Sequence, residues 1–254
     1  MKLITQHYKD RFTKLCLIAQ THDTDKCAIR KEGHRGDMDP GHSHPYSVFY
    51  HDFLKDRANE PLNVAEIGVL TGASLRMWRQ FLPEATIVGF DIHPKYLNMT
   101  KDIDNVKVDI MNIRSVPSIN DGLAKHGPFD LIIEDTTHLF DDQIRFINEA
   151  HKHLTPGGHM IIEDIFKDRD FRTGQSHAPE EYEKHILPEV VEKFENVFMI
   201  HLDHNNRRSG KWNNDGLIVF QSAKPISDES AKPISDESAK PISDESAKPI
   251  SISK

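Results

Sequence analysis

Short apolar runs alternate with amphipathic segments along most of the chain. The runs are rich in valine, isoleucine, leucine and phenylalanine at consecutive positions, which is typical of strands buried on both faces of a parallel sheet. We predict seven strands, at residues 62–67, 86–91, 106–109, 129–134, 158–163, 195–200 and 216–221. With helical segments between them, they predict an α/β fold with a doubly wound, seven-stranded, mostly parallel sheet.

Helical spacing marks the N-terminal part of the chain and the intervals between the strands. Tyr8, Phe12, Leu15 and Ala19 follow one another at the spacing of an amphipathic helix, and aromatic residues predict a second helix from Tyr46 onward. Residues 1–60 are therefore predicted to be a helical extension. Further helices are predicted within residues 74–82, 115–125, 141–154 and 179–194.

A repeat of eight residues, SAKPISDE, begins at Ser222. A proline in every unit breaks helices and sheet ladders, and one isoleucine per unit cannot form a core. We expect residues 222–254 to be a disordered tail; a partner-docking strip or a linker is the alternative. The expected organisation is a helical segment at 1–60, an α/β domain at 61–221 and the tail at 222–254.

The composition narrows the class of protein. A formal net charge of −8 argues against a large nucleic-acid surface, which needs clustered lysine and arginine. No apolar run approaches the ~18 residues of a membrane span, and no apolar N-terminal stretch marks a signal peptide. The two cysteines form no CxxC motif, which fits a reducing compartment. We expect a cytoplasmic protein with no nucleic-acid partner and no membrane span.

The first predicted strand of the sheet ends in a glycine-rich turn that carries an acid. Gly68 and Gly72 lie between Glu66 and the helix that begins near Ser74. The glycines allow a tight turn and the close approach of a ligand to the backbone. Glu66 would repel a pyrophosphate but suits a ligand with a cationic amine. The plainer interpretation is an ordinary glycine-rich turn.

Acids also end the next two predicted strands. Asp91 follows the glycine turn by about 20 residues, where a carboxylate can accept both ribose hydroxyls of an adenosine. Asp109 ends the third strand and would face the adenine edge. Either residue alone could equally cap a turn. Acids at the ends of three consecutive strands favour a shared binding edge.

The fourth and fifth predicted strands end in a second group of acids. Asp135 follows one strand, and Glu163 and Asp164 end the other. If the strands are neighbours, these carboxylates repel one another unless a cation joins them or one of them is protonated. Oxygen donors suit a hard ion such as Mg²⁺ better than Zn²⁺. His138 could reach a hydroxyl held on that ion, whereas helix capping and a surface histidine are the plainer interpretations.

These motifs together resemble the class I S-adenosylmethionine-dependent methyltransferases. More narrowly, they resemble the metal-dependent O-methyltransferases that act on macrolide sugars and rhamnosyl groups. The resemblance covers residues 20–165 and rests on EIGVLTGAS, Asp91, Asp109, FDLIIEDTTH, LTPGGHMIIEDI, Thr24-Asp25-Lys26 and the aromatic run YSVFY at 46–50. The insertion GHRGDMDPGHSHP departs from the family, so the resemblance does not say which of His34, His42 and His44 faces the site.

The resemblance implies sites for S-adenosylmethionine and Mg²⁺. The implied cofactor residues are Glu66, Gly68, Gly72 and Ser74 at the methionine part, Asp91 at the ribose, Asp109 at the adenine amine, and Tyr46 in a loop that closes over the cofactor. The implied Mg²⁺ ligands are Asp135, Glu163 and Asp164, with His138 as the general base.

The activity implied by the resemblance is methyl transfer to a sugar hydroxyl, of rhamnose or another deoxysugar in a glycan or glycoside. A catechol-type phenol O-methyltransferase is one alternative, and a non-catalytic adenosylmethionine-binding module is another. The expected partner is a small-molecule or glycan acceptor, and a homo-oligomer is an open alternative to a monomer.

Two polar loops, at about 165–180 and 201–215, are expected to cover the acceptor site. Trp212 could stack on a sugar ring or be an ordinary exposed loop residue. The four arginines of these loops would meet an anionic acceptor or be solvated; they are Arg169, Arg172, Arg207 and Arg208.

Overall fold

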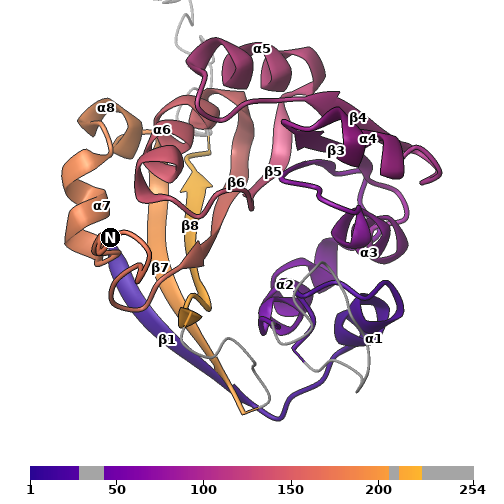
Figure 1. Cartoon of the computed structure of the whole chain (residues 1–254), viewed down its shortest axis with the longest axis horizontal. Coiled ribbons are helices and arrows are strands. Elements are labelled where there is room, and N and C mark those ends of the chain that lie inside the picture. The colour runs from indigo at the N-terminus through magenta and orange to yellow at the C-terminus, as the bar shows by residue number, and fades with distance from the viewer. Residues whose placement is uncertain (29–42, 206–211, 225–254) are drawn as a thin grey trace, which may run out of the picture. The chain divides into compact units, whose positions relative to one another are not determined.

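The computed structural model describes residues 1–28, 43–205 and 212–224, which belong to one compact unit, Met1–Lys224. A single sheet of eight strands organises this unit, in the order β1-β7-β8-β6-β5-β2-β3-β4 (Figure 1). The strands are β1 (Lys2–Lys9), β2 (Asn63–Ile67), β3 (Thr86–Asp91), β4 (Val106–Ile110), β5 (Phe129–Glu134), β6 (Leu154–Ile165), β7 (Phe194–His204) and β8 (Gly216–Ser222). Only β8 runs antiparallel to its neighbours among these described strands.

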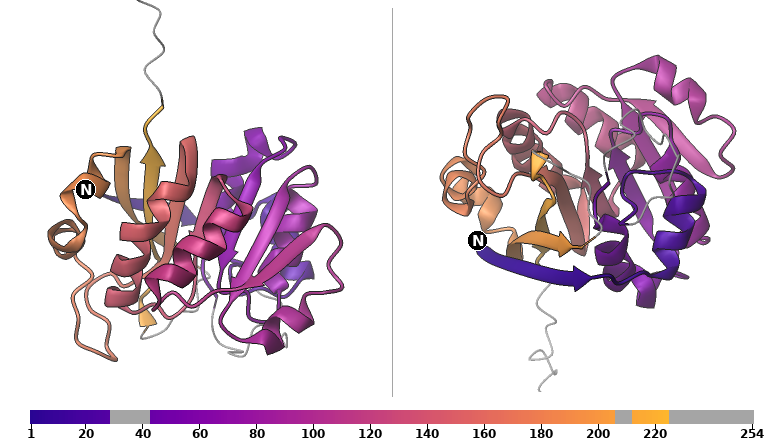
Figure 2. Two further views of the ribbon diagram at one scale, coloured as in Figure 1. Left: turned by 90° about the horizontal axis from the view of Figure 1, so that it is seen from above. Right: turned by 60° about the horizontal axis from the view of Figure 1, so that its bottom comes forward.

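Helices cover both faces of the sheet because successive strand residues are apolar on opposite sides. Val64 packs in one core with α1 to α4, whereas Ala65 packs in the other with α5 to α8 (Figure 2). The helices are α1 (Lys14–Thr21), α2 (Tyr46–Leu54), η2 (Lys55–Arg57), α3 (Ala73–Phe81), α4 (Pro94–Met99), α5 (Val116–His126), α6 (Phe140–Ala150), η3 (His151–His153), α7 (Pro179–His185) and α8 (Pro188–Val191). The predicted doubly wound, mostly parallel sheet is confirmed.

The structure of the N-terminal residues differs from the sequence prediction. Residues 2–9 form an eighth strand, β1, which pairs in parallel with β7 at the edge of the sheet, whereas the sequence predicted helix there and seven strands (Figure 1). Accessibility alternates along β1, the period of a strand at a sheet edge. The first helix begins only at Lys14, where the Thr13 side chain accepts the backbone N–H of Cys16. Phe12 is 44% exposed and lies outside that helix.

The carboxyl ends of β2 and β5 lie at the point where the order of strands reverses. From β2 the chain continues to β3 and β4 on one side, and from β5 to β6 on the other. Ligands of doubly wound sheets bind in the crevice at such a point. Register places Glu66 beside Ile133, and Ile133 beside Ile161. Asp135 and Glu163, each two residues further on, therefore reach the same level of the sheet.

Several sequence predictions fall on residues outside the described ranges. They concern the repeat from residue 225 onward, His34 and His42 of the insertion, and Arg207 and Arg208. Within the described ranges, no helix has both the length and the apolar character needed to cross a membrane.

Removing residues 1–9 should destabilise the fold, because β7 would lose its whole outer neighbour. We expect the thermal midpoint to fall by more than about 5 °C, which calorimetry would measure. The matched control removes residues 225–254 and should leave the midpoint unchanged. Equal midpoints for the intact chain and the chain lacking residues 1–9 would show that β1 does not stabilise the sheet.

Candidate active site

A cavity of about 540 Å³ opens at the carboxyl ends of β2, β3 and β5. Its wall combines the N-terminal residues Thr24, Asp25 and Lys26 with the turn after β2, the end of β3, residues 111–114 and the segment Asp135–His138. The volume lies within the range of small-molecule and cofactor sites. Segments far apart in the sequence thus meet at the edge where the sheet topology places a ligand.

The turn after β2 approaches the backbone of β5 so closely that only glycine fits. Gly68 has a φ of +97°, and a Cβ there would lie 1.8 Å from the carbonyl oxygen of Asp135. One carboxylate oxygen of Asp91 accepts the N–H groups of Val69 and Leu70, each at 3.3 Å. The turn is therefore fixed by a tight backbone contact on one side and an acid on the other, and Gly68 and Asp91 both line the cavity.

Lys26 lies among three carboxylates beneath the cavity. Its ammonium group donates hydrogen bonds to Asp135 and Glu163 and lies 3.7 Å from Glu66 Oε1. Its side chain is 2% exposed, and Tyr50 donates a 2.6 Å hydrogen bond to the second oxygen of Glu163. The lysine thus ties the N-terminal segment to the ends of β2, β5 and β6.

For Lys26 and Asp135, the attraction between opposite charges outweighs the free-energy cost of burying a charged group. Burial alone would lower the pKa of Lys26, but the facing carboxylates raise it well above its usual value, so the ammonium keeps its charge. Burial also opposes the charge of Asp135, yet Lys26 and then His138 lower the pKa of Asp135 to about 2. Burial raises the pKa of Glu66 to about 7 and that of Glu163 well above its usual value.

Glu66 keeps one oxygen without a hydrogen-bond partner among the described residues. Oε2 accepts a 2.8 Å bond from the hydroxyl of Ser74, which lines the cavity, while Oε1 accepts none. Leaving a buried carboxylate oxygen unpaired costs free energy unless a ligand or water supplies a donor. The end of β2 is therefore suited to a cationic or N–H-bearing group.

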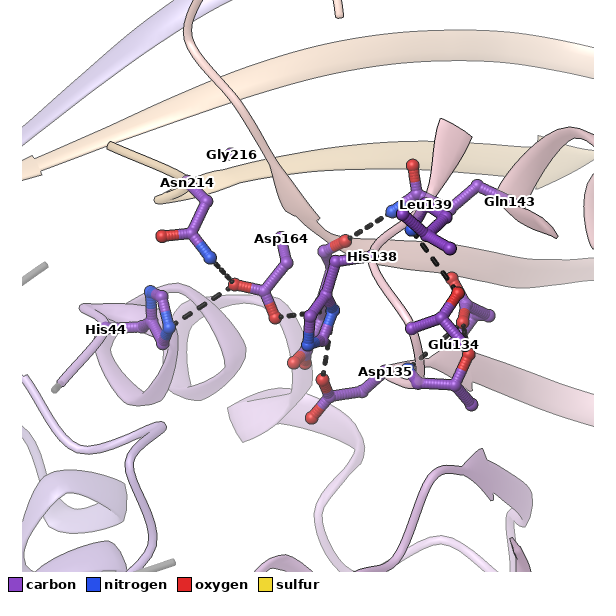
Figure 3. A network of polar contacts seen from close by, with 12 residues as sticks. His44, Glu134, Asp135, His138, Leu139, Gln143, Asp164, Asn214 and Gly216 are labelled. Carbon is purple, nitrogen blue, oxygen red and sulfur yellow. Dashed lines mark hydrogen bonds and ion pairs between the residues drawn. The ribbon is translucent and has the colours of Figure 1, made fainter. Parts of the chain in front are cut away.

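His138 points toward the carboxylates of Asp164 and Asp135 (Figure 3). Its Nδ1 lies 3.2 Å from Asp164 Oδ2 and 3.9 Å from Asp135 Oδ1. One potential ligand atom from each of the three residues lies within 4.8 Å of the others. Burial raises the pKa of Asp164, while the imidazoles of His138 and His44 act in the opposite direction. This group could bind a divalent cation.

Both His138 and Asp164 adopt left-handed backbone conformations, with φ of 54° and 59°. Such conformations cost free energy for residues other than glycine and occur where function requires an unusual side-chain direction. The hydroxyl of Tyr46 accepts the backbone N–H of Asp164 at 3.0 Å, and Arg172 donates to the carbonyl of His138 at 2.9 Å. Each strained residue is thus held by one long side chain from another segment.

A second set of contacts supports the far side of Asp164. His44 Nε2 lies 3.3 Å from Asp164 Oδ1, and Asn214 donates a hydrogen bond to the same oxygen (Figure 3). His44 Nδ1 lies 2.9 Å from Asp215, and its ring stacks on Tyr46 at 4.7 Å. Burial disfavours the charged imidazole, but the two aspartates raise the pKa of His44 to about 10. Asp164 is therefore held between two histidines.

Comparison with known proteins identifies the domain that carries this site. Residues 64–219, more than half of the chain, match the family described as "Methyltransferase domain". The chain belongs to this methyltransferase family. The match runs from the start of β2 into β8, and it therefore includes the ends of β2, β3 and β5, at which the cavity opens.

Curated relatives of this chain include two O-methyltransferases of actinobacterial species. The mycinamicin VI 2''-O-methyltransferase of Micromonospora griseorubida is 31% identical over 140 residues, half of this chain and 33% of that protein. The L-olivosyl-oleandolide 3-O-methyltransferase of Streptomyces antibioticus is 28% identical over 167 residues, 61% of this chain and 41% of that protein. The chain thus spans a third to two fifths of these relatives.

A solved structure shares the fold of the methyltransferase domain. The MycE methyltransferase of the mycinamycin biosynthetic pathway, in complex with Mg, SAH and mycinamycin VI, superposes with a TM-score of 0.62 at 19% identity. The comparison covers 92% of this chain and 58% of that chain. At this identity the likeness concerns the architecture alone.

Three residues predicted for the cofactor do not line the cavity of the methyltransferase domain in the way expected. Asp109 faces α5, where it pairs with Lys125 and His126, because side chains alternate along β4 and its direction leads away from the cavity. Tyr46 is buried beneath Asp164 instead of closing over a ligand. Gly72, with φ of +81°, caps α3 and packs against Thr100. The predicted contacts of Asp109 and Tyr46 with a cofactor do not fit this geometry.

Glu163 also differs from its predicted role as a metal ligand. Lys26 and Tyr50 occupy its two oxygens, and His138 takes its place beside Asp135 and Asp164 in the group that could hold a cation. The three acids lie in one region, as expected, but the Lys26 ammonium binds Asp135 and Glu163, and Asp164 lies beside His138 instead. Glu66, Gly68, Ser74 and Asp91 lie at or directly beneath the cavity, as their positions in the sequence suggested.

The supporting roles of four residues at the methyltransferase site do not follow from the sequence patterns: Lys26, Arg172, Asn214 and Asp215. Lys26 belongs to a noted motif, but its 109-residue separation from Asp135 conceals the contact. Asn214 and Asp215 directly precede β8, the antiparallel strand, whose beginning lies at the same edge as the carboxyl ends of the other strands. An acid-amide pair before an antiparallel last strand was the signal that could have identified them.

Replacement of Lys26 by methionine should destabilise the methyltransferase domain by about 3–5 kcal/mol, because it leaves buried carboxylates without their cation. The double variant Lys26→Met/Glu163→Gln should recover part of this loss, since it removes one charge of each sign. Lys125→Met, which breaks an exposed pair with Asp109, is the matched control and should cost less than about 1 kcal/mol. Urea denaturation measures all three, and equal losses for Lys26→Met and Lys125→Met would contradict the role assigned to Lys26.

Proposed function

We propose that the protein transfers a methyl group from S-adenosylmethionine to a sugar hydroxyl, with Mg²⁺, on a deoxysugar such as rhamnose. The observation that carries the proposal is the position of His138, which lines the cavity and faces Asp164 and Asp135. A proton acceptor thus stands between a cofactor-sized cavity and a candidate cation site. The names of the relatives, which specify O-methylation of antibiotic sugars, support the substrate class.

The cavity fits the proposed cofactor in size and charge. Asp91 presents a carboxylate for ribose hydroxyls, and Gly68 lines the cavity at a turn whose backbone packs against the carbonyl of Asp135. Glu66 Oε1, buried and without a hydrogen-bond partner among the described residues, lies 3.7 Å from the Lys26 ammonium and suits the amine of the methionine part. Acids at three strand ends attract a sulfonium cation and would repel a phosphate-bearing cofactor. We therefore assign Glu66, Gly68, Ser74 and Asp91 to the cofactor.

The proposed ion site combines oxygen donors with a base. Asp135 and Asp164 offer carboxylate oxygens, which Mg²⁺ prefers. A bound Mg²⁺ would polarise a sugar hydroxyl and lower its pKa. Lys26 neutralises Asp135 from the opposite side and keeps Glu163 occupied, so the chain itself limits the number of carboxylates that face the acceptor.

His138 is the proposed general base of the transfer. Its Nδ1 lies 3.2 Å from Asp164 Oδ2, and with the proton on Nδ1 the ring would leave Nε2 to accept the proton of the hydroxyl. Asp164 in turn is held in place by His44 and Asn214. The orientation of the base is therefore set by groups from three separate parts of the chain.

Replacement of His138 by alanine should lower turnover by about a hundredfold or more, because it removes the imidazole of the cavity wall that faces Asp164 and Asp135. Affinity for S-adenosylhomocysteine should remain. The assay is mass spectrometry of methylated products from rhamnosides, other deoxysugars and catechol. His22→Ala, which removes the histidine that follows α1 as its C-cap and does not line the cavity, is the control. Turnover of His138→Ala at the wild-type rate would refute the base, and a preference for catechol would replace the sugar by a phenol.

Replacement of Asp164 by asparagine should weaken Mg²⁺ binding by more than about tenfold, since it removes one of two proposed carboxylate ligands. Titration calorimetry in the presence of S-adenosylhomocysteine measures this directly. Asp109→Asn is the matched control, because this acid pairs with α5 outside the cavity. Unchanged Mg²⁺ affinity in Asp164→Asn, or full turnover in excess EDTA, would remove the ion from the proposal.

A further inference from the structure

Four side chains form a cluster of aromatic rings and one cation beside the active site. We call Phe166, Phe171, Arg172 and Trp212 the aromatic platform. The guanidinium of Arg172 lies 5.6 Å from the ring centre of Phe166 and 5.4 Å from that of Trp212. Phe171 meets Trp212 edge-on, with ring centres 4.8 Å apart. The platform therefore links Phe166, Phe171 and Arg172, which follow β6, to Trp212, which lies shortly before β8.

The platform is attached directly to the proposed base. Arg172 donates hydrogen bonds to the carbonyl oxygens of His138, at 2.9 Å, and Thr137, at 3.4 Å. Its guanidinium also binds the carboxylate of Asp170, which is 1% exposed. The arginine is thus fixed on three sides, and its fourth contact is the pair of aromatic rings. A ligand that touches the platform would lie next to His138.

His138 separates the platform from the cofactor cavity. Thr137 and His138 line that cavity, whereas none of the four platform side chains does. A base that accepts a proton during methyl transfer must contact the acceptor hydroxyl while the cofactor occupies the other side. The acceptor therefore has to approach from a direction that the cofactor leaves free, and the platform contacts the backbone of Thr137 and His138 from outside the cavity lining.

The exposed part of the platform has the chemistry of a sugar-stacking surface. Phe171 is 46% exposed, although a large apolar side chain gains free energy from burial, and Trp212 is partly exposed. Aromatic rings bind the apolar C–H face of a pyranose, and a deoxysugar has a larger apolar face than a fully hydroxylated sugar. Arg172 adds N–H donors at the edge of the same surface.

We propose that the aromatic platform is the acceptor subsite and stacks against the apolar ring face of the deoxypyranose whose hydroxyl is methylated. This inference rests on the proposed sugar O-methyltransferase function and adds to it the residues that select the acceptor. It assigns Trp212 and Phe171 to acceptor affinity and not to cofactor binding.

Intrinsic fluorescence tests the proposal without turnover, because the chain has only two tryptophans and the other, Trp78, is fully buried in the core. The full-length protein with saturating S-adenosylhomocysteine and Mg²⁺ is titrated with methyl α-L-rhamnoside and with 4-nitrophenyl α-L-rhamnoside, and the KM and kcat for both are measured in parallel. The variants are Trp212→Ala, Trp212→Phe and Phe171→Ala, and the matched control is Phe12→Ala, a similarly exposed phenylalanine outside the site.

We expect Trp212→Ala and Phe171→Ala to raise the KM for both rhamnosides by about tenfold, with kcat and S-adenosylhomocysteine affinity little changed. Trp212→Phe should retain most of the affinity, and Phe12→Ala all of it. If the wild-type protein methylates rhamnosides and the KM is unchanged in Trp212→Ala and Phe171→Ala, the platform is not the acceptor subsite. The proposed function would not be affected by that result. A loss confined to the nitrophenyl glycoside would overturn the sugar as the occupant. If the wild-type protein neither binds nor methylates either rhamnoside, the proposed function and the platform both fail.

Discussion

The site depends on one internal ion cluster, in which a buried ammonium group is shared by carboxylates from three strand ends. A parallel sheet brings the carboxyl ends of β2, β5 and β6 to one edge, and the sequence places an acid at or just beyond each of them. Without a cation these charges would repel one another in a medium of low polarity. Lys26 supplies that cation from the N-terminal segment, so the position of this segment and the arrangement of the acids depend on the same contacts.

The same cluster gives each acid a different task. Glu163 is engaged on both oxygens and holds the lysine, Glu66 keeps one oxygen for a ligand, and Asp135 extends to His138. Asp164 stands apart from Lys26 and is supported by His44 and Asn214. Tyr46 and Arg172 hold the left-handed backbone of Asp164 and His138, so strain at the reacting edge is balanced by rigid contacts with other segments.

Much of this arrangement follows from local sequence patterns. The buried strands and the acids at their ends predict the sheet, its ligand-binding edge and the position of residues such as Glu66, Asp91 and His138. The edge strand β1 escapes such analysis because Tyr8 and Phe12 imitate helical spacing, and its pairing with β7 joins residues almost 200 positions apart. Tertiary packing likewise sets the direction of the Asp109 side chain, because this depends on which face of β4 meets α5. It also sets the partner of Lys26, because Glu163 lies 137 residues further along the chain.

Because Lys26 binds Glu163, Asp135 and Asp164 are the carboxylates that we expect to bind an ion. A crystal structure of the protein with S-adenosylhomocysteine and Mn²⁺, with the ion located by its anomalous scattering, tests this most directly. We expect one Mn²⁺ bound by carboxylate oxygens of Asp135 and Asp164, with the Lys26 ammonium still hydrogen-bonded to Glu163. Mn²⁺ bound by Glu163, with Lys26 displaced from it, would contradict the account.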